Sequence, residues 1–184
     1  MQPALLVIDA QQEYFRPHGR WVVTGGEEAL AQIETLLAAF RGEGLPVFHI
    51  VHEALDPQSP VFRAGSEGQK MHPALSVQPG EHLIKKHFPG SFTETPLAAY
   101  LRRAGVDTPF ITGFMTHVCC DTTTRQAAER GLHPVFVSDA TATRGRPFAG
   151  EIVPAPDIQR ATCAAMGDFA EVLATQDAIL RLRS

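Results

Sequence analysis

Cys119 lies at a point in the sequence where a sulfur atom could act as a nucleophile. The stretch before it is apolar and turns at Gly113, and from Val118 to Gly131 the residues follow a helical pattern. Cys119 is therefore expected where a strand has ended and a helix begins. The first turn of a helix has unpaired N–H groups and a partial positive charge, which favour a thiolate and can bind an oxyanion. We predict that Cys119 is a nucleophile; the alternative is an ordinary buried cysteine.

A carboxylate and an ammonium group follow two other apolar runs. Residues 4–8 form a run that ends at Asp9, and the short run 81–88 contains Lys85 and Lys86. In open α/β sheets, ligands bind beyond the carboxyl ends of the strands. An ammonium group stabilises a thiolate, and a carboxylate can accept the thiol proton. These residue types predict attack on an amide-type carbonyl, although Asp9 taken alone could also be a turn or N-cap residue.

The segments that would position these groups alternate between strand and helix patterns. Strand-like apolar runs occur at 4–8, 46–51, 81–88, 109–112, 134–138 and 171–174, and helical periodicity occurs at 27–41, 95–105, 118–131 and 157–169. The alternation predicts an α/β fold with a mainly parallel sheet and helices on both faces, in one domain over residues 1–184. Residues 176–183 are expected to have no regular structure. The irregular stretches 53–79 and 140–155 are expected to shape a pocket at the carboxyl edge of the sheet.

Composition and charge exclude several classes of protein. The chain has 184 residues, of which 44% are hydrophobic and 20% charged, and a formal net charge of -4, as expected of a soluble globular domain. Without a basic stripe, nucleic acid is not an expected partner. Apolar runs are too short to span a membrane, and no basic segment precedes the first one, so neither membrane association nor a signal peptide is expected. The three cysteines favour a reduced, cytoplasmic setting, and no nucleotide-binding fingerprint occurs, so no cofactor is expected.

Several motifs occur in a specific order that covers most of the chain. They are Leu5–Gln11 with Phe15, Lys86–Leu97, Gly113–Cys119, Thr122–Ala127, Gly131 and Val137–Ala140. This order and spacing resemble the isochorismatase-like cysteine hydrolases, which include nicotinamidases, N-carbamoylsarcosine amidases and ureidoacrylate amidohydrolases. The resemblance implies a six-stranded parallel sheet in a three-layer α/β/α fold. It also implies a catalytic triad formed by Cys119, Lys86 and Asp9.

The family motifs also decide between neighbouring residues of the same type. Family members place the lysine six residues before the phenylalanine that corresponds to Phe92, which selects Lys86 over Lys85. They place the cysteine six residues after a glycine, which selects Cys119 over Cys120.

The resemblance further implies how the reaction would run. A cis peptide bond precedes the position of Met115, and the backbone N–H groups of Met115 and Cys119 form an oxyanion hole. Asp9 would accept the proton of Cys119, and Lys86 would hold the anion in place. The expected reaction is hydrolysis of a C–N bond in a small amide, ureide or carbamoyl compound through a thioester. Family members that cleave isochorismate lack the cysteine, so Cys119 favours an amidase.

Some members of the family use a metal ion, and members commonly form oligomers. The Asp-x-His arrangement of metal-assisted nicotinamidases is missing here, although His49, His52 and His72 occur in the corresponding region. Histidines at this spacing do not by themselves form a metal site, so we expect no metal. Because family members commonly assemble, we expect a homo-oligomer, either a dimer or a tetramer, that acts on a small-molecule substrate.

Four further side chains are candidates for binding the substrate. They are Phe15, Trp21, Phe92 and His117. The aromatic rings could form an apolar wall of the pocket or belong to the core. His117 could line the pocket or cap the helix. Arg144 and Arg146 could bind a substrate carboxylate or lie in a solvated loop.

Two other functions are compatible with the same fold. One is a non-catalytic oligomeric binding or scaffold protein, in which Cys119 would react no faster than free cysteine. The other is a redox-sensing thiol protein, which predicts reversible oxidation of Cys119 by peroxide and no hydrolysis.

Overall fold

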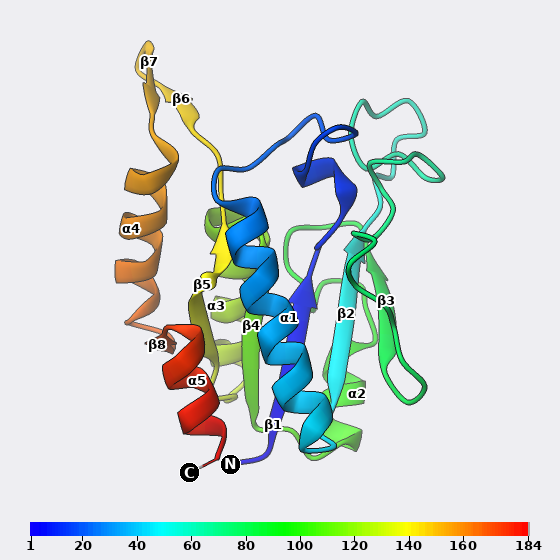
Figure 1. The fold of residues 1–184 in the computed structure, drawn as a ribbon, viewed down its shortest axis with the longest axis vertical. Helices are drawn as coiled ribbons and strands as arrows, with labels where there is room; N and C mark the ends of the chain where they lie inside the picture. The colour runs from blue at the N-terminus through cyan, green and yellow to red at the C-terminus, as the bar shows by residue number, and fades with distance from the viewer. Residues whose placement is uncertain (184) are drawn as a thin grey trace.

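The computed structural model describes residues 1–183 and contains a six-stranded sheet in the order β3-β2-β1-β4-β5-β8 (Figure 1). The strands span Pro3–Ile8 (β1), Val47–His52 (β2), His82–Lys86 (β3), Thr108–Phe114 (β4), Val135–Ala142 (β5) and Glu171–Leu173 (β8). Every neighbouring pair in this sheet is parallel. The predicted six-stranded parallel sheet is therefore confirmed. Because the strands are parallel, all their carboxyl ends meet at one edge.

Helices cover both faces of the sheet, so the fold has three layers (Figure 1). On one face lie α1 (Gly26–Gly42) and α5 (Thr175–Leu182). On the other face lie α2 (Leu97–Arg103), α3 (Asp121–Glu129) and α4 (Ala155–Met166). The predicted α/β/α arrangement is confirmed. Within residues 1–183, no helix is both long enough and apolar enough to cross a membrane.

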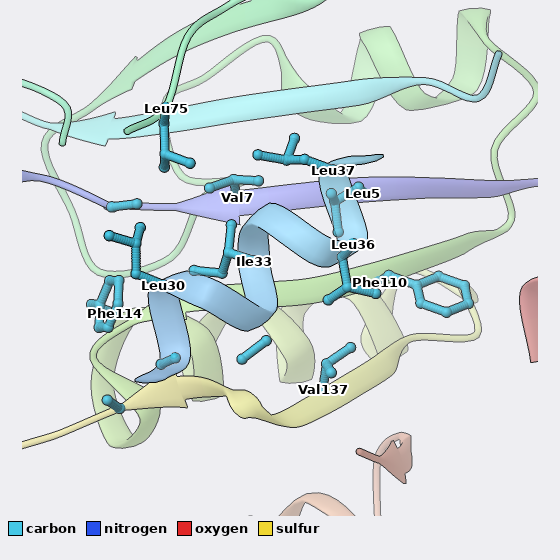
Figure 2. Packing of buried hydrophobic residues seen from close by; sticks show 14 of the residues in the cluster. Leu5, Val7, Leu30, Ile33, Leu36, Leu37, Leu75, Phe110, Phe114 and Val137 are labelled. Atoms are coloured by element: carbon cyan, nitrogen blue, oxygen red, sulfur yellow. The ribbon is translucent and has the colours of Figure 1, made fainter. Parts of the chain in front are cut away.

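The central strand β1 is buried on both faces, and its alternate side chains belong to two apolar clusters. Leu5 and Val7 pack with Ile33 of α1 (Figure 2). Leu6 and Ile8 belong to the cluster on the other face. A strand that is buried on both faces has a continuous apolar sequence instead of an alternating one. This explains why a plain apolar run predicts β1.

The end of the chain differs from its prediction. Residues 176–183 were expected to lack regular structure, but α5 occupies nearly all of them, so this prediction is wrong. The helix forms because Thr175 and Ala178 are buried, and Ala178 joins the same apolar cluster as α1.

Two loops also contain structure that the sequence patterns do not indicate. After β5, an antiparallel hairpin forms from β6 (Arg146–Phe148) and β7 (Glu151–Val153). After β4, the chain first makes a π-helical turn, η2 (Thr116–Cys120), and only then enters α3. Cys119 therefore lies in a wide turn that joins β4 to α3.

The long loop 53–79 lies over the carboxyl end of β1, as expected. A short 3-10 helix, η1 (Gln12–Tyr14), follows β1. The backbone N–H groups of Gln12 and Glu13 donate to the carbonyl oxygens of Lys70 and Gly68, at 2.8 and 2.7 Å. These bonds hold the loop against the segment that follows Asp9.

Candidate active site

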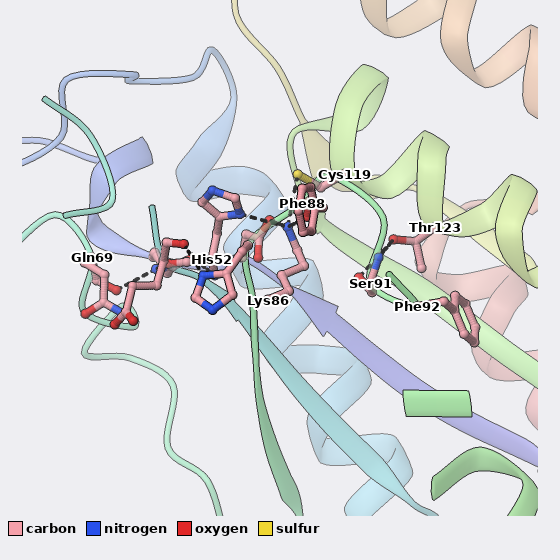
Figure 3. A network of polar contacts seen from close by, with 12 residues as sticks. His52, Gln69, Lys86, Phe88, Ser91, Phe92, Cys119 and Thr123 are labelled. Carbon is pink, nitrogen blue, oxygen red and sulfur yellow. Dashed lines mark hydrogen bonds and ion pairs between the residues drawn. The ribbon is translucent and has the colours of Figure 1, made fainter. Parts of the chain in front are cut away.

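Asp9, Lys86 and Cys119 come together at the carboxyl edge of the sheet. Asp9 directly follows β1, Lys86 is the last residue of β3, and Cys119 lies in η2 after β4. The Lys86 Nζ lies 2.8 Å from Asp9 Oδ2 and 3.4 Å from Cys119 Sγ (Figure 3). The side chains of Asp9 and Lys86 are completely buried, and Cys119 is 7% exposed. The three groups thus form one contiguous buried cluster.

The Lys86 ammonium group is fixed by two further contacts. Its Nζ donates to the carbonyl oxygen of Phe88 at 3.0 Å and contacts His52 Nδ1 at 3.3 Å (Figure 3). Because an ammonium group can only donate, His52 Nδ1 must accept. Burial lowers the pKa of His52 to about 4, and the positive charge of Lys86 contributes to the shift. His52 is therefore neutral at pH 7 and serves as an acceptor for Lys86.

The backbone around this cluster is unusual at three positions. Asp9 has a φ of 51°, in the left-handed region that few non-glycine residues adopt, although aspartate adopts it more readily than most. Gly113, which pairs with Ile8 in the sheet, has a φ of 116°, and a Cβ atom there would overlap the Ile8 carbonyl oxygen. Glycine thus lets the end of β4 approach the end of β1. The peptide bond between Phe114 and Met115 is cis, as the family resemblance implies.

The sulfur of Cys119 is held in its protonated form. Burial raises the pKa of the Cys119 thiol, and the Asp9 carboxylate raises it further, while Lys86 only partly offsets these effects. Burial alone would lower the pKa of Lys86, but Asp9 and Cys119 outweigh it and the pKa is raised. Lys86 is therefore charged and Cys119 is a thiol at rest. Burial and the adjacent carboxylate thus oppose the thiolate that the ammonium group and the start of a helix favour.

Asp9 has one carboxylate oxygen available to accept a proton. Its Oδ2 is paired with the Lys86 ammonium group. Both oxygens are buried and neither makes a hydrogen bond within residues 1–183, but Oδ1, unlike Oδ2, also has no ion-pair partner there. A buried oxygen without a donor is costly, so it is uncommon in folded proteins. This oxygen lies in the same cluster as a protonated sulfur.

A cavity of about 320 Å³ opens onto the sulfur. Cys119 and Met115 line it together with aromatic side chains, among them Tyr14, Trp21 and Phe62. The rings of Trp21 and Phe62 meet edge to face, with centroids 5.8 Å apart, and Tyr14 is 5.3 Å from Phe62. The cavity is large enough for a small organic molecule and is mostly apolar. Of the four predicted substrate-binding residues, Trp21 lines this cavity.

Phe15 and Phe92 lie elsewhere. Phe15 is 3% exposed and packs edge to face on Phe114, with ring centroids 5.3 Å apart. Phe92 is directed away from Lys86 and Cys119 (Figure 3), and the guanidinium of Arg130 lies 4.8 Å from its ring centroid. The structure does not bring these two rings into the cavity that contains the sulfur.

His117 makes a contact with the loop that follows β5. Its Nδ1 lies 2.7 Å from the hydroxyl oxygen of Thr143. Burial lowers the pKa of His117, and the neighbouring Arg146 contributes to the shift. His117 thus ties the η2 turn to the strand end that leads to Arg144.

Polar residues after β1 organise the wall of the cavity, and sequence reasoning gave them no role. The Gln11 side chain donates to the carbonyl oxygens of His52 and Gln69, at 2.8 and 2.6 Å (Figure 3). The buried Glu13 carboxylate accepts the backbone N–H of Phe62 at 3.2 Å. These polar residues come soon after a buried strand, and this position is the sequence feature that could have identified them.

The three histidines considered as metal ligands are held apart by different partners. His49 pairs with Glu81 at 2.9 Å, His52 contacts Lys86, and the His72 ring packs on Phe15 with centroids 4.6 Å apart. In the described part of the chain, no three His, Cys, Asp or Glu side chains are grouped so that they could hold a metal ion.

Known proteins of similar sequence and structure point to one family. Residues 3–177 match the isochorismatase domain. The chain is 36% identical to the isochorismatase family protein YddQ of Bacillus subtilis, over 98% of this chain and 100% of that protein. It is 29% identical to maleamate amidohydrolase of Pseudomonas putida, over 78% of this chain and 73% of that protein. The crystal structure of a cysteine hydrolase from Pseudomonas syringae superposes with a TM-score of 0.91 at 27% identity, covering 99% of this chain and 92% of the other. These matches confirm the resemblance, and the chain belongs to the isochorismatase family of hydrolases.

Proposed function

We propose that this protein is a cysteine hydrolase that cleaves a C–N bond in a small amide, ureide or carbamoyl compound. The main support is the buried Lys86 ammonium group, which contacts both the Asp9 carboxylate and the Cys119 sulfur at the cavity. Similarity to an amidohydrolase and to a cysteine hydrolase also supports the proposal. Amide cleavage needs a nucleophile, a proton acceptor and a proton donor, and this cluster contains groups for each role.

In the first step, the sulfur of Cys119 attacks the carbonyl carbon while its proton moves to Asp9. The raised pKa of the thiol means that a free thiolate does not accumulate, so proton transfer accompanies attack. The free Oδ1 of Asp9 is the natural acceptor. The Lys86 ammonium group stabilises the negative charge as it develops on the sulfur.

The carbonyl oxygen then carries negative charge in a tetrahedral intermediate. We assign its stabilisation to the backbone N–H groups of Met115 and Cys119. The N–H groups of Val118 and Cys120 are already used, since both donate to the Met115 carbonyl oxygen at 3.1 and 3.3 Å. A well-placed donor of this kind contributes about 3 kcal/mol to stabilising the transition state.

Collapse of the intermediate breaks the C–N bond and leaves a thioester on Cys119. Protonated Asp9 gives its proton to the departing nitrogen, which leaves as ammonia or an amine. A water molecule then attacks the thioester, and Asp9 accepts a proton from it. The acid product leaves, and the proton on Asp9 returns to the sulfur, which restores the thiol and the carboxylate.

Replacement of the sulfur tests this proposal. Cys119→Ala should abolish ammonia release from any substrate found in a panel of small amides. Cys120→Ala is the matched control, because its thiol is also buried but does not line the cavity. Mass spectrometry of the wild type mixed with substrate should detect an acyl adduct on the Cys119 peptide. Turnover by Cys119→Ala at the wild-type rate would overturn the proposal.

A redox-sensing role is less well supported. Sensor thiols are accessible and have a low pKa, so that the reactive thiolate is present at neutral pH. Cys119 is buried, and its pKa is raised. Slow labelling of Cys119 by iodoacetamide together with amide turnover would separate the hydrolase from both the sensor and the scaffold protein.

A further inference from the structure

A glutamine of α4 joins the turn that carries Cys119 to the end of β5. The Gln159 Oε1 lies 2.6 Å from the hydroxyl oxygen of Thr116, a completely buried residue of η2. The Gln159 Nε2 donates to the carbonyl oxygens of Ser138 and Thr141, at 2.9 and 3.3 Å, and to the Thr141 hydroxyl at 3.1 Å. One side chain therefore connects three parts of the fold, α4, β5 and η2.

The partners of Gln159 fix the direction of each hydrogen bond. A carbonyl oxygen can only accept, so the side-chain nitrogen of Gln159 must face Ser138 and Thr141. Its oxygen then faces Thr116, and because an amide oxygen can only accept, the Thr116 hydroxyl must donate. Thr116 is thus held in one orientation from outside the η2 turn.

The segment of β5 that binds Gln159 is one where the pairing with β4 is interrupted. The register of the two strands shifts between Ile111 and Gly113, so β5 carries extra residues there. Extra residues of this kind leave backbone groups outside the sheet ladder, and such irregularities are common beside active sites. Gln159 donates to the carbonyl oxygen of Ser138 in this segment. The segment in turn fixes the side-chain amide of Gln159 within reach of η2.

Thr116 directly follows Met115, one of the two residues to which we assign the oxyanion donors. The Met115 carbonyl oxygen accepts the N–H groups of Val118 and Cys120, at 3.1 and 3.3 Å, which closes the turn from inside. These local bonds set the shape of the turn, and the bond from Thr116 to Gln159 helps to set its position against β5. Neither Thr116 nor Gln159 is among the residues that line the cavity. Their contact can therefore act on a substrate only through the turn.

We infer that Gln159 is a positioning residue of the hydrolase, which keeps the oxyanion donors in place by holding Thr116. This inference rests on the proposed function and adds to that site a residue of α4 that lies outside the cavity. Donors that stabilise a transition state must be placed in advance, and a displacement of about 1 Å can cost about 100-fold in rate. The contact should therefore affect kcat and leave the binding of the ground-state amide unchanged.

Two substitutions remove the contact from opposite sides. Gln159→Met keeps the length of the side chain and removes its polar atoms, and Thr116→Val replaces a hydroxyl by a methyl group. Each should lower kcat on the best amide of the panel by about 10- to 100-fold, with KM within about twofold of the wild type. Acylation and thioester hydrolysis both pass through an oxyanion, so kcat falls whichever step is slower. Thr116→Ser keeps the hydroxyl and should retain kcat within about threefold.

A double-mutant cycle separates this role from a merely structural one. If both substitutions act through the same hydrogen bond, the kcat of the double variant should be close to that of the more impaired single variant. The matched control is Gln126→Met. Gln126 of α3 also fixes a loop, but its partners are Phe92 and Thr93, which follow β3, so kcat should stay within about threefold of the wild type. Losses that multiply in the double variant, or an equal loss in Gln126→Met, would overturn the inference.

A reversible adduct separates the inference from the proposed function. The thiol of Cys119 can add to an aldehyde: a sulfur–carbon bond forms, and the thiol proton passes to the former carbonyl oxygen, so no C–N bond is involved. The oxygen of this hemithioacetal occupies the place of the oxyanion. Carbon-13 NMR with acetaldehyde labelled at the carbonyl carbon measures its dissociation constant. Gln159→Met should raise this constant by about tenfold, and Gln126→Met should leave it unchanged.

The adduct and the amide panel give separate answers. Equal dissociation constants in the wild type and in Gln159→Met would overturn the inference, even if amides are hydrolysed. A raised constant without ammonia release from any amide would overturn the hydrolase proposal and keep Gln159 as the residue that positions the turn.

Discussion

Two clusters of buried charge lie at opposite edges of the sheet, and each is built on one carboxylate. At the amino edge, Glu81 accepts hydrogen bonds from Arg41 Nε at 2.7 Å and Nη2 at 3.1 Å, from His49 Nε2 at 2.9 Å and from the Gln78 N–H at 2.8 Å. Both of its oxygens are therefore occupied. Burial alone would raise the pKa of Glu81, but these donors lower it to about 2. This carboxylate is a permanent anion that joins α1, β2 and the start of β3.

At the carboxyl edge, the Asp9 carboxylate has a single charged neighbour, Lys86, and its Oδ1 is left without a donor. Full hydrogen bonding, as at Glu81, would hold the anion too firmly to take part in proton transfer. Incomplete hydrogen bonding costs stability but leaves an oxygen that can accept the proton of Cys119. The comparison suggests that the two clusters were shaped by different demands, stability at one edge and reactivity at the other.

Asp9→Asn should show the largest effect of that difference. The substitution keeps the shape of the side chain but removes the proton acceptor, so kcat/KM for amide hydrolysis should fall by about 10³-fold. Steady-state ammonia release measures it, on protein that circular dichroism shows to be folded. Glu81→Gln is the matched variant, and its kcat/KM should stay close to that of the wild type. Similar losses of activity in both variants would show that the two carboxylates are not functionally distinct.

Gly113→Ala should test what keeps the reactive cluster together. A Cβ atom at Gly113 would overlap the Ile8 carbonyl oxygen, so the ends of β1 and β4 would have to separate. The free energy of unfolding should fall by about 3 kcal/mol or more in a urea titration. Gly131→Ala is the control, because Gly131 has a φ of 77° but no atom within 4 Å of the added Cβ. It should cost only about 1 kcal/mol, from the left-handed backbone, and equal costs would contradict the close approach of the strands.

The grouping of Asp9, Lys86 and Cys119 could be predicted from the sequence because each of them lies at the end of a strand or soon after it. Strands buried on both faces appear as continuous apolar runs, and the residue after each run lies at the carboxyl edge. Asp9 is an example. By contrast, Phe62 belongs to an irregular loop whose path depends on a hydrogen bond to Glu13, so no sequence pattern places it in the cavity. α5 was missed because only Thr175 and Ala178 of its residues are buried, which makes a weak pattern.

The protonation of Cys119 could not be predicted either. A helix start favours a thiolate, but burial and a carboxylate oppose it, and both depend on the folded structure. The same reason explains why the sequence could not decide whether Phe15 and Phe92 line the cavity. Their positions near catalytic motifs are visible in the sequence, but the direction of each ring is decided by packing.

Glu81→Gln should have a moderate effect, on stability only. The Glu81 side chain is 8% exposed, and the substitution weakens its charge-assisted bonds to Arg41 and His49. The free energy of unfolding at pH 7 should therefore fall by about 2 kcal/mol. Glu67→Gln is a suitable control, since Glu67 is 56% exposed and pairs with Lys70 at the surface, where an ion pair contributes little.

The stability conferred by Glu81 should also depend on pH in a defined direction. Because its folded pKa is about 2 and its ordinary value is 4.5, its contribution is complete above pH 4.5 and is lost as the pH falls towards 2. Urea unfolding at several values across this range should show the wild type losing more stability than Glu81→Gln, so that the two curves converge at low pH. Parallel curves would mean that Glu81 is no better stabilised as an anion in the folded protein than in the unfolded chain. The contrast with Asp9 would then have to rest on catalysis alone.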